Sequence, residues 1–306
     1  MSSSLSFTAE VRRLPGDLCL ILSMMAAGST VVVSRLIAAG LPPFTAAALR
    51  FAIALPIFLT LMRIRGVPLP RPGARDVLLL ALQGLCGSVG YSVLLVLGMR
   101  TASAADAGVI AGSLPAVVAL AGWLLLKERV RVRQWLAIGL ACVGVAAIQL
   151  GGHAQSSTGS SSLAGGALVF AAVVCEALFL VLDKRLRFPI EPLAQATLMC
   201  AFGLAFSLLP ALAEPASLHF IDQTALLCVV YYALIPTVCG YLLWYSGMGR
   251  VDAGRSALYT AVLPLSAVAL AAMVLRESIS RAQLVGAACV MAAIIVGATG
   301  ARRERS

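Results

Sequence analysis

Charged residues are scarce in this 306-residue chain: Asp, Glu, Lys and Arg together make up 12% of it, and 60% is hydrophobic. Soluble globular proteins average about 25% charged and about 45–50% apolar residues. A soluble fold of this length exposes too much surface to hide so much apolar material, and a disordered chain contains far less of it. The composition, with a mean hydropathy of +0.97, therefore predicts an integral membrane protein.

Residue patterns that bind metals or perform catalysis are also missing. The two histidines, His153 and His219, lie far apart, and none of the eight cysteines forms a CxxC pair, so we interpret the cysteines as small apolar packing residues. GxSxG, HExxH and Walker A patterns are absent, which argues against an intramembrane enzyme and against ATP-driven transport by this chain alone. We therefore expect no cofactor, no metal and no enzymatic activity.

Ten apolar segments are each long enough to cross a bilayer, whose hydrocarbon core takes about 20 helical residues. They are residues 17–39, 43–63, 75–97, 104–126, 132–150, 163–182, 190–213, 222–246, 253–275 and 281–300. The longest connection, residues 151–164, is rich in Gly and Ser and is interpreted as a flexible periplasmic linker. The sequence thus predicts an all-α membrane protein with a short N-terminal segment, residues 1–15, and a basic tail, residues 301–306.

The net charge of +10 follows the topology of these segments and does not mark a nucleic-acid surface. With the N-terminus in the cytoplasm, 18 of the 23 Lys and Arg residues fall on the cytoplasmic side, three fall outside, and Arg35 and Arg50 lie within spans. The positive-inside rule then places both termini in the cytoplasm, which requires an even number of spans. We expect a monomeric, multi-pass protein of the bacterial inner membrane, surrounded by lipid and acting on a small-molecule substrate, with no nucleic-acid partner.

The two halves of the chain resemble each other at a constant offset of 149 residues. Matches between Ala-, Leu- and Val-rich helices arise by chance, but coincident Pro, Glu and Gln residues do so much less readily. These matches pair Pro115 with Pro264, Glu128 with Glu277, and Gln134 with Gln283. We therefore divide the chain into a first repeat, residues 16–150, and a second repeat, residues 165–300.

An odd number of spans gives the two repeats opposite orientations in the membrane. Inverted repeats are common in secondary transporters, which bind substrate near the midplane between the halves. The sequence therefore predicts a central cavity that opens alternately to either side. Pro115 and Pro264 interrupt helical hydrogen bonding, so they are expected either to act as matched hinges or only to shape the cavity. Glu128 and Glu277 are interpreted as structural residues, expected to cap helices or pair with nearby Arg residues at helix junctions.

These features resemble the EamA family of the drug/metabolite transporter superfamily. The resemblance rests on the ten spans in two halves, on the repeated Pro with Glu thirteen residues later and then Gln, and on the segment LPPFTAAALRF at residues 41–51. Arg50 occupies the Arg position of that segment, whereas Met199 takes its place in the second half. Size and loop pattern are most similar to bacterial amino-acid exporters of the YddG type, which implies a transporter and not an enzyme.

Two ionisable side chains lie well inside the predicted spans, where such groups are costly and often functional. Arg50 lies about 10 Å from the outer edge and Glu176 about 20 Å from it, at about 1.5 Å per residue. The functional interpretation is that Arg50 meets a carboxylate in the cavity or at its outer gate, and that Glu176 binds an ammonium group or a proton. Structural roles for both side chains stay open. Arg35, near the outer end of its span, is expected to extend toward the lipid headgroups.

Polar and aromatic residues of the third, eighth and ninth spans complete the predicted substrate site. With Arg50 and Glu176, its members are Gln83, Ser88, Tyr91, Tyr232, Thr237, Tyr241 and Tyr259. The repeat pairs Gln83 with Tyr232, and Ser88 with Thr237. Such mates are expected to line a cavity between two related halves. A further aromatic group near the predicted cytoplasmic surface is interpreted as an interfacial belt, made of Trp123, Trp135, Trp244 and Tyr245.

The sequence favours a secondary transporter that exports small metabolites, above all amino acids, including aromatic and neutral ones. The alternative is a proton-coupled exporter of lipophilic cations or drugs that uses Glu176. The two functions share a fold and differ in what Glu176 binds, an ammonium group of the substrate or a proton.

Overall fold

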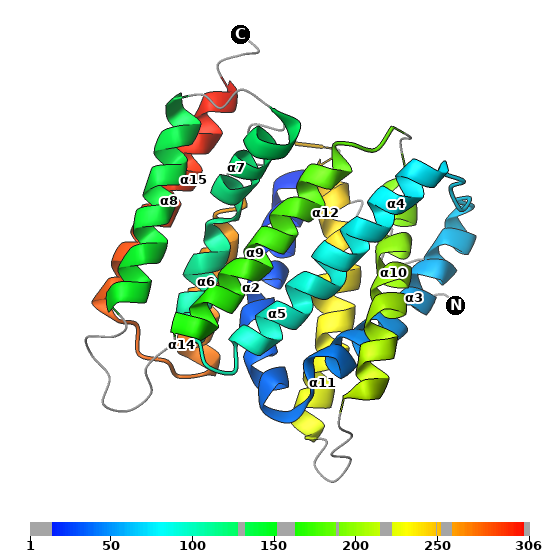
Figure 1. Ribbon diagram of the computed structural model, residues 1–306, viewed down its shortest axis with the longest axis horizontal. Coiled ribbons are helices and arrows are strands. Elements are labelled where there is room, and N and C mark those ends of the chain that lie inside the picture. The colour runs from blue at the N-terminus through cyan, green and yellow to red at the C-terminus, as the bar shows by residue number, and fades with distance from the viewer. Residues whose placement is uncertain are drawn as a thin grey trace.

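The computed structural model describes residues 14–127, 132–151, 163–187, 190–214, 222–248, 250–251 and 259–302. These residues form helices and connecting turns, without strands (Figure 1). Six helical segments are long and apolar enough to cross a membrane. They are α2 (Gly16–Gly40), α3 (Pro43–Arg65), α4 to α5 (Ala74–Gly98), α9 (Leu163–Asp183), α10 (Pro192–Ala213) and α11 to α12 (Gln223–Met248).

The other four predicted spans take different forms. The span predicted at 104–126 is a bent pair, α6 (Ala104–Gly112) and α7 (Leu114–Leu126), which meet at 44° and together make a seventh candidate span. Three further apolar helices occupy the remaining predicted spans; they are α8 (Val132–Gly151), α14 (Val262–Val274) and α15 (Arg281–Arg302). By length and composition the described residues therefore provide six or seven spans, and the count of ten stays a prediction.

Several predicted features lie outside the described residues. They are nearly all of the N-terminal segment and the Gly/Ser linker, most of the C-terminal tail, and Glu128.

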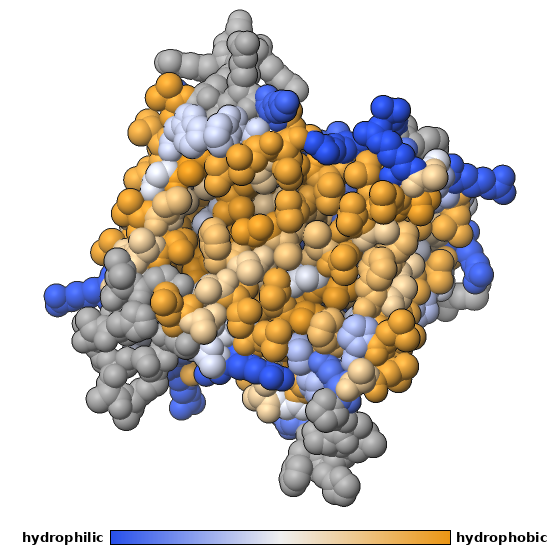
Figure 2. Space-filling view, viewed as in Figure 1, coloured by the Kyte–Doolittle hydropathy of each residue, from blue (hydrophilic) through white to orange (hydrophobic). Residues whose placement is uncertain are grey.

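The helices pack side by side in one bundle (Figure 1). α8 packs against α15 at one end and α3 against α10 at the other, with α2, α9 and the α4–α5 and α11–α12 segments between them. The face of the bundle in view is largely hydrophobic, and strongly hydrophilic residues gather toward its two ends (Figure 2). This distribution is the one expected of a bundle whose sides face lipid.

Helix α3 shows how local sequence signals set the position of a functional residue. Pro43 lies in its first turn, where the missing N–H costs no hydrogen bond, and Gly66 ends it in the left-handed conformation with φ 64°. Arg50 therefore lies two turns into a helix with well-defined ends.

The offset of 149 residues reappears in the backbone. π-helical turns interrupt both the third and the eighth predicted spans, as η1 (Gly84–Gly90) between α4 and α5 and η4 (Ala233–Cys239) between α11 and α12. Lys127 and Arg276 are the two described non-glycine residues with positive φ, at 55° and 54°. The repeat in sequence is therefore also a repeat in local structure.

Contacts between the halves come in exchanged pairs. Gly98 of the first repeat lies against Gly165 of the second, since a Cβ on Gly165 would come 3.0 Å from the Gly98 carbonyl oxygen. Their repeat mates also touch: a Cβ on Gly247 would come 3.0 Å from the carbonyl oxygen of Gly16. Such exchange is the property expected of two halves related by a pseudo-two-fold axis.

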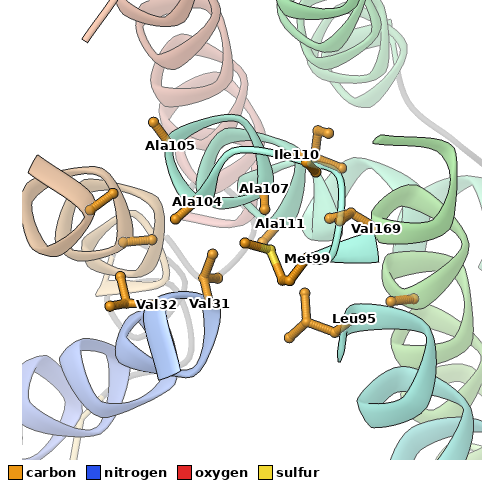
Figure 3. Close-up of a cluster of buried hydrophobic side chains, with 14 of the residues drawn as sticks. Val31, Val32, Leu95, Met99, Ala104, Ala105, Ala107, Ile110, Ala111 and Val169 are labelled. Carbon is orange, nitrogen blue, oxygen red and sulfur yellow. The ribbon is translucent and has the colours of Figure 1, made fainter. Parts of the chain in front are cut away.

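The largest buried apolar cluster joins helices of both halves (Figure 3). It brings together Val31 and Val32 of α2, Leu95 and Met99 at the end of α5, and Ile110 of α6 with Val169 of α9. Alanines supply much of the α6 face, which permits close packing of the first part of the bent span.

Candidate functional site

A cavity of about 610 Å³ lies between the two halves. Its walls come from α2, α3, the η1–α5 segment, α6, α7, α8, α9, α10, the α11–α12 segment, α14 and α15, so both repeats contribute. This volume is within the usual range for small-molecule sites, about 300–1,000 Å³. Seven of the nine predicted substrate-site residues line it: Arg50, Ser88, Tyr91, Glu176, Tyr232, Thr237 and Tyr241.

Gln83 does not line the cavity, so its predicted position was wrong. It is fully buried, and its Nε2 donates to Asp183 Oδ1 at 3.3 Å and to the Phe179 carbonyl at 3.5 Å. Gln195 Nε2 donates to the same Asp183 oxygen. The π-helical turn that starts at Gly84 shifts the helical register. As a result, Ser88 lies on the face of the helix that lines the cavity, and Gln83 does not.

Tyr259 and Pro264 also lie outside the cavity wall, whereas Thr260 and Pro115 line it. Pro115 lies in the first turn of α7, directly after the 44° bend. Pro264 lies near the start of α14 and packs against the end of α6, where a Cβ on Gly112 would come 2.8 Å from the Pro264 Cβ. The two prolines therefore lie at neighbouring breaks in the bundle, and their action as hinges stays a prediction.

The cationic side chain of Arg50 lies in an unusual environment. The side chain is 8% exposed, and its guanidinium carbon lies 4.2 Å from the centroid of the Phe51 ring and 4.5 Å from that of Tyr232. Its Nε is buried without a hydrogen-bond partner. The two rings offset part of the cost of burying the charge. A buried donor without a partner can form a hydrogen bond to an anionic group of a ligand.

Glu176 faces the same cavity from α9 of the opposite half, and its side chain is half-buried. Arg50 and Glu176 both belong to the described part of the chain, and they do not form an ion pair. A cation from one half and a carboxylate from the other therefore share one cavity without direct contact as an ion pair. A ligand that carries both an anionic and a cationic group matches this arrangement.

An aromatic wall extends along one face of the η4–α12 segment. Trp244 and Tyr245 line the cavity together with Thr237 and Tyr241, so the prediction that this pair belongs to an interfacial belt was wrong. The Tyr241 ring lies 5.9 Å from that of Tyr245 and 6.3 Å, edge to face, from that of Phe58. Helical spacing was the available signal, because Tyr241 follows Thr237 by four residues, and Trp244 and Tyr245 follow Tyr241 by three and four.

Trp123 and Trp135, by contrast, are exposed on the outside of the bundle. They are 42% and 44% exposed, and their rings pack edge to face with centroids 5.4 Å apart. Their placement is consistent with the predicted aromatic belt.

Further residues of the wall were not predicted. Thr30, Phe51 and Phe179 line the cavity, and the Thr30 hydroxyl donates to the Ala27 carbonyl at 2.7 Å. Phe179 follows Glu176 by one turn, so helical spacing was a usable signal for Phe179. Phe51 directly follows Arg50, and adjacent helical positions do not share a face, so helical spacing provided no such signal for Phe51.

Carboxylates of the second half cap helices of the first at the predicted outer end. Glu277 accepts hydrogen bonds from the first two backbone N–H groups of α6, each at 3.0 Å. Glu214 accepts the backbone N–H groups of Phe44 at 3.0 Å and Thr45 at 2.8 Å, and also the Thr45 hydroxyl. These caps satisfy orphan helix donors and hold the two halves together.

Two more contacts strengthen the same end. Gln283 Nε2 donates to Asp106 Oδ1 at 2.8 Å, which joins α15 to α6. Arg35 donates to the Met99 carbonyl and, at 3.1 Å, to the Ala102 carbonyl. Arg35 therefore stabilises the turn after α5, and the expectation that it extends to the headgroups was wrong.

The cavity extends toward the other end of the bundle, where the predicted cytoplasmic ends of the spans lie. Lining residues on that side are Gln134, Leu180, Tyr245 and Thr260. Toward the predicted outer side the wall stops near the level of Arg50 and Tyr232.

Comparison with known proteins gives consistent results. The EamA-like transporter family matches residues 14–150 and again residues 163–298. "Uncharacterized transporter YetK" of Bacillus subtilis strain 168 is 35% identical over 276 residues, which cover 90% of this chain and 84% of that protein. A "Probable terminal-alkyne amino-acid exporter" of Streptantibioticus cattleyicolor is 29% identical over 242 residues, which cover 77% of this chain and 79% of that protein.

Two further similarities are more distant. A "Probable amino-acid metabolite efflux pump" of Salmonella typhimurium is 26% identical over 60% of this chain and 64% of that protein. A crystal structure with 23% sequence identity matches the fold with a TM-score of 0.64, over 95% of this chain and 98% of that chain.

Proposed function

This chain belongs to the EamA-like transporter family, and from that membership we propose that it is a secondary transporter that exports small metabolites, above all amino acids, including neutral and aromatic ones. It is a transporter and not an enzyme, and it spans the membrane several times. The observation that carries the proposal is the shared cavity, which holds Arg50 from one half and Glu176 from the other without an ion pair between them.

The chemistry of the cavity matches the three parts of an amino acid. Arg50 binds the α-carboxylate through its planar guanidinium, which is suited to bidentate hydrogen bonds. Glu176 binds the α-ammonium group. The wall that includes Phe179, Tyr241 and Trp244 receives the side chain. Relatives named as amino-acid exporters and efflux pumps support this choice of substrate.

The proposed topology is ten spans in two inverted repeats, with both termini on the cytoplasmic side of the bacterial inner membrane. The matched π-helical turns and the exchanged glycine contacts support the symmetry. The cavity reaches the predicted cytoplasmic ends while carboxylate caps hold the opposite end together. This conformation is the inward-facing state, which takes up substrate from the cytoplasm. A single chain transports its substrate by alternating between this conformation and the outward-facing one.

A second function is supported by the same carboxylate. Glu176 beside aromatic side chains is also an arrangement that binds a lipophilic cation and exchanges it for a proton. In that case Arg50 opposes binding, because it places a positive charge in the same cavity. The amino-acid function is preferred because it uses both charges.

Transport by the purified protein in liposomes separates the two functions. The wild type is tested with a panel of labelled amino acids and with tetraphenylphosphonium, in counterflow and under imposed pH gradients. We expect counterflow of neutral or aromatic amino acids, and we expect Glu176→Gln to reduce it. Cation export lost in Glu176→Gln, without amino-acid movement in the wild type, would establish the alternative.

A further inference from the structure

Arg50 and Tyr232 are the two residues that line both the central cavity and a second, smaller pocket. The smaller pocket has a volume of about 10 Å³ and has room for about one water molecule. Its other lining residues are Ile37, Pro43, Ala46, Ala47, Ser92, Val96 and Val229. The side chains of Arg50 and Tyr232 therefore separate two spaces inside the protein.

The smaller pocket lies on the predicted outer side of this pair. Ile37 is in the last turn of α2 and Pro43 begins α3, and these two helix ends belong to the predicted outer face. Val96 of α5 and Val229 of α11 complete the wall. A path from the central cavity past Arg50 into the small pocket therefore points to the outside, between α2, α3, α5 and α11.

We infer that Arg50 and Tyr232 form the outer barrier of the transport path, and that the guanidinium which closes it is also the group that binds the substrate carboxylate. The inference rests on the proposed function and adds to it a coupling between binding and opening. The Arg50 guanidinium carbon lies 4.5 Å from the centroid of the Tyr232 ring. A carboxylate that enters the cavity offers stronger, charge-assisted hydrogen bonds and competes with the ring for the guanidinium. Binding of the carboxylate thus weakens the contact that closes the path.

The repeat supports this assignment by showing what the same region looks like without the barrier. At the offset of 149 residues, Arg50 corresponds to Met199 and Tyr232 to Gln83. The positions that correspond to Ala47, Ser92 and Val96 of the small pocket are Ala196, Tyr241 and Tyr245.

On the inner side, four of the nine positions equivalent to the residues of the small pocket are part of the main cavity, and Gln83 is not among them. Ala196, Met199, Tyr241 and Tyr245 all line the cavity. This part of the inner counterpart is therefore continuous with the substrate space, whereas the outer pocket is separated from that space by a cation and a ring. Because Met199 carries no charge, control by a carboxylate operates at the outer barrier alone.

Thiol labelling from the outside tests the barrier. The eight native cysteines are replaced, and Thr30→Cys is introduced as a reporter, since Thr30 lines the central cavity. A membrane-impermeant maleimide is applied to right-side-out vesicles. Arg100→Cys, in an exposed turn on the predicted outer side, serves as the accessible control, and Arg71→Cys as the cytoplasmic one. Where complete replacement prevents folding, the native Cys200, which also lines the cavity, is kept as the reporter.

The expected result is slow labelling at the Thr30→Cys reporter, faster by about tenfold when Tyr232→Ala or Arg50→Ala is added, since each removes the cation–π contact between Arg50 and Tyr232. Tyr232→Phe keeps the ring and is expected to leave labelling slow. Loading the vesicles with a transported amino acid should accelerate labelling, whereas its carboxamide analogue should not.

Three outcomes would overturn the inference. They are equal labelling with and without the Tyr232 ring, equal acceleration by acid and amide, and labelling of the Arg71→Cys protein in place of the Arg100→Cys protein. Labelling does not depend on turnover, so a wild type that moves no amino acid refutes the proposed function separately from the barrier.

Discussion

Glu277, in the second half of the chain, caps Ala104 at the start of α6 in the first half, with a carboxylate oxygen 3.0 Å from the backbone nitrogen. The cap places a negative charge at the positive end of a helix and satisfies a donor that the helix leaves free. It joins the halves at the end of the bundle opposite to the opening of the cavity.

Replacing this cap should weaken the structure measurably. Glu277→Ala is expected to lower the free energy of unfolding by about 1–2 kcal/mol, the usual effect of losing a helix cap. Glu277→Gln keeps an acceptor oxygen and should lose less. Thermal unfolding of the purified protein in detergent measures the difference. Glu191→Ala is the matched control, because Glu191 lies at the start of α10 without a capping hydrogen bond from its side chain. Equal losses in both variants would contradict the capping role.

Much of the bundle was predictable because its signals are local. Apolar length identified the helices, and the spacing of Pro, Glu and Gln identified the repeat. Position within the spans was enough to select Arg50 and Glu176 as candidates for the cavity, since buried charges in a membrane protein seldom face lipid, but it left structural roles for both open. The same argument could not show the rings on either side of Arg50, because Tyr232 comes from a helix far away in sequence.

The errors have physical causes. Gly84 begins a π-helical turn, and composition does not distinguish an i to i+5 bonding pattern from an ordinary helix, so the face that carries Gln83 was misassigned. Trp244 and Tyr245 were placed by their depth near the interface, while their helical spacing from Thr237 pointed to the cavity. Arg35 donates to backbone carbonyls in the turn after α5. The predicted limits of the spans gave no information on the conformation of that turn, so these acceptors were missed.

The planarity of the Arg50 guanidinium should matter as much as its charge. Arg50→Lys keeps the cation but loses bidentate hydrogen bonding, so we expect the KM for amino acids to rise by about tenfold or more. Counterflow in liposomes provides the measurement. Arg100→Ala is the control, since Arg100 is exposed outside the cavity. An unchanged KM in Arg50→Lys would show that the guanidinium does not contact the substrate.

The aromatic wall should set the preference for side-chain size. Trp244→Ala removes a large apolar surface from the cavity, so the KM for Phe or Trp should rise by about tenfold while the KM for Ala changes little. Competition between labelled Phe and unlabelled amino acids measures the shift. Trp123→Ala, on the exposed outer surface, is the matched control. A parallel rise for all substrates would instead indicate general damage to the cavity.

Close packing of the two halves should be more sensitive to one methyl group than any lipid-facing position. A Cβ on Gly98 would lie 2.8 Å from Val169 Cγ2 and 2.9 Å from the Gly165 carbonyl oxygen, and a backbone atom cannot easily move away. Gly98→Ala is therefore expected to lower the free energy of unfolding by about 1–3 kcal/mol, as overpacking does.

Gly139→Ala provides the contrast, because no atom lies within 4 Å of the added Cβ. Alanine is a better helix former than glycine by about 1 kcal/mol, so this variant should be unchanged or more stable. Thermal unfolding of both proteins in the same detergent compares them. Because Gly247 is the repeat mate of Gly98 and lies against Gly16 in the exchanged contact, Gly247→Ala should show a loss similar to that of Gly98→Ala. Destabilisation of one and not the other would mean that the two halves do not share an equivalent interface.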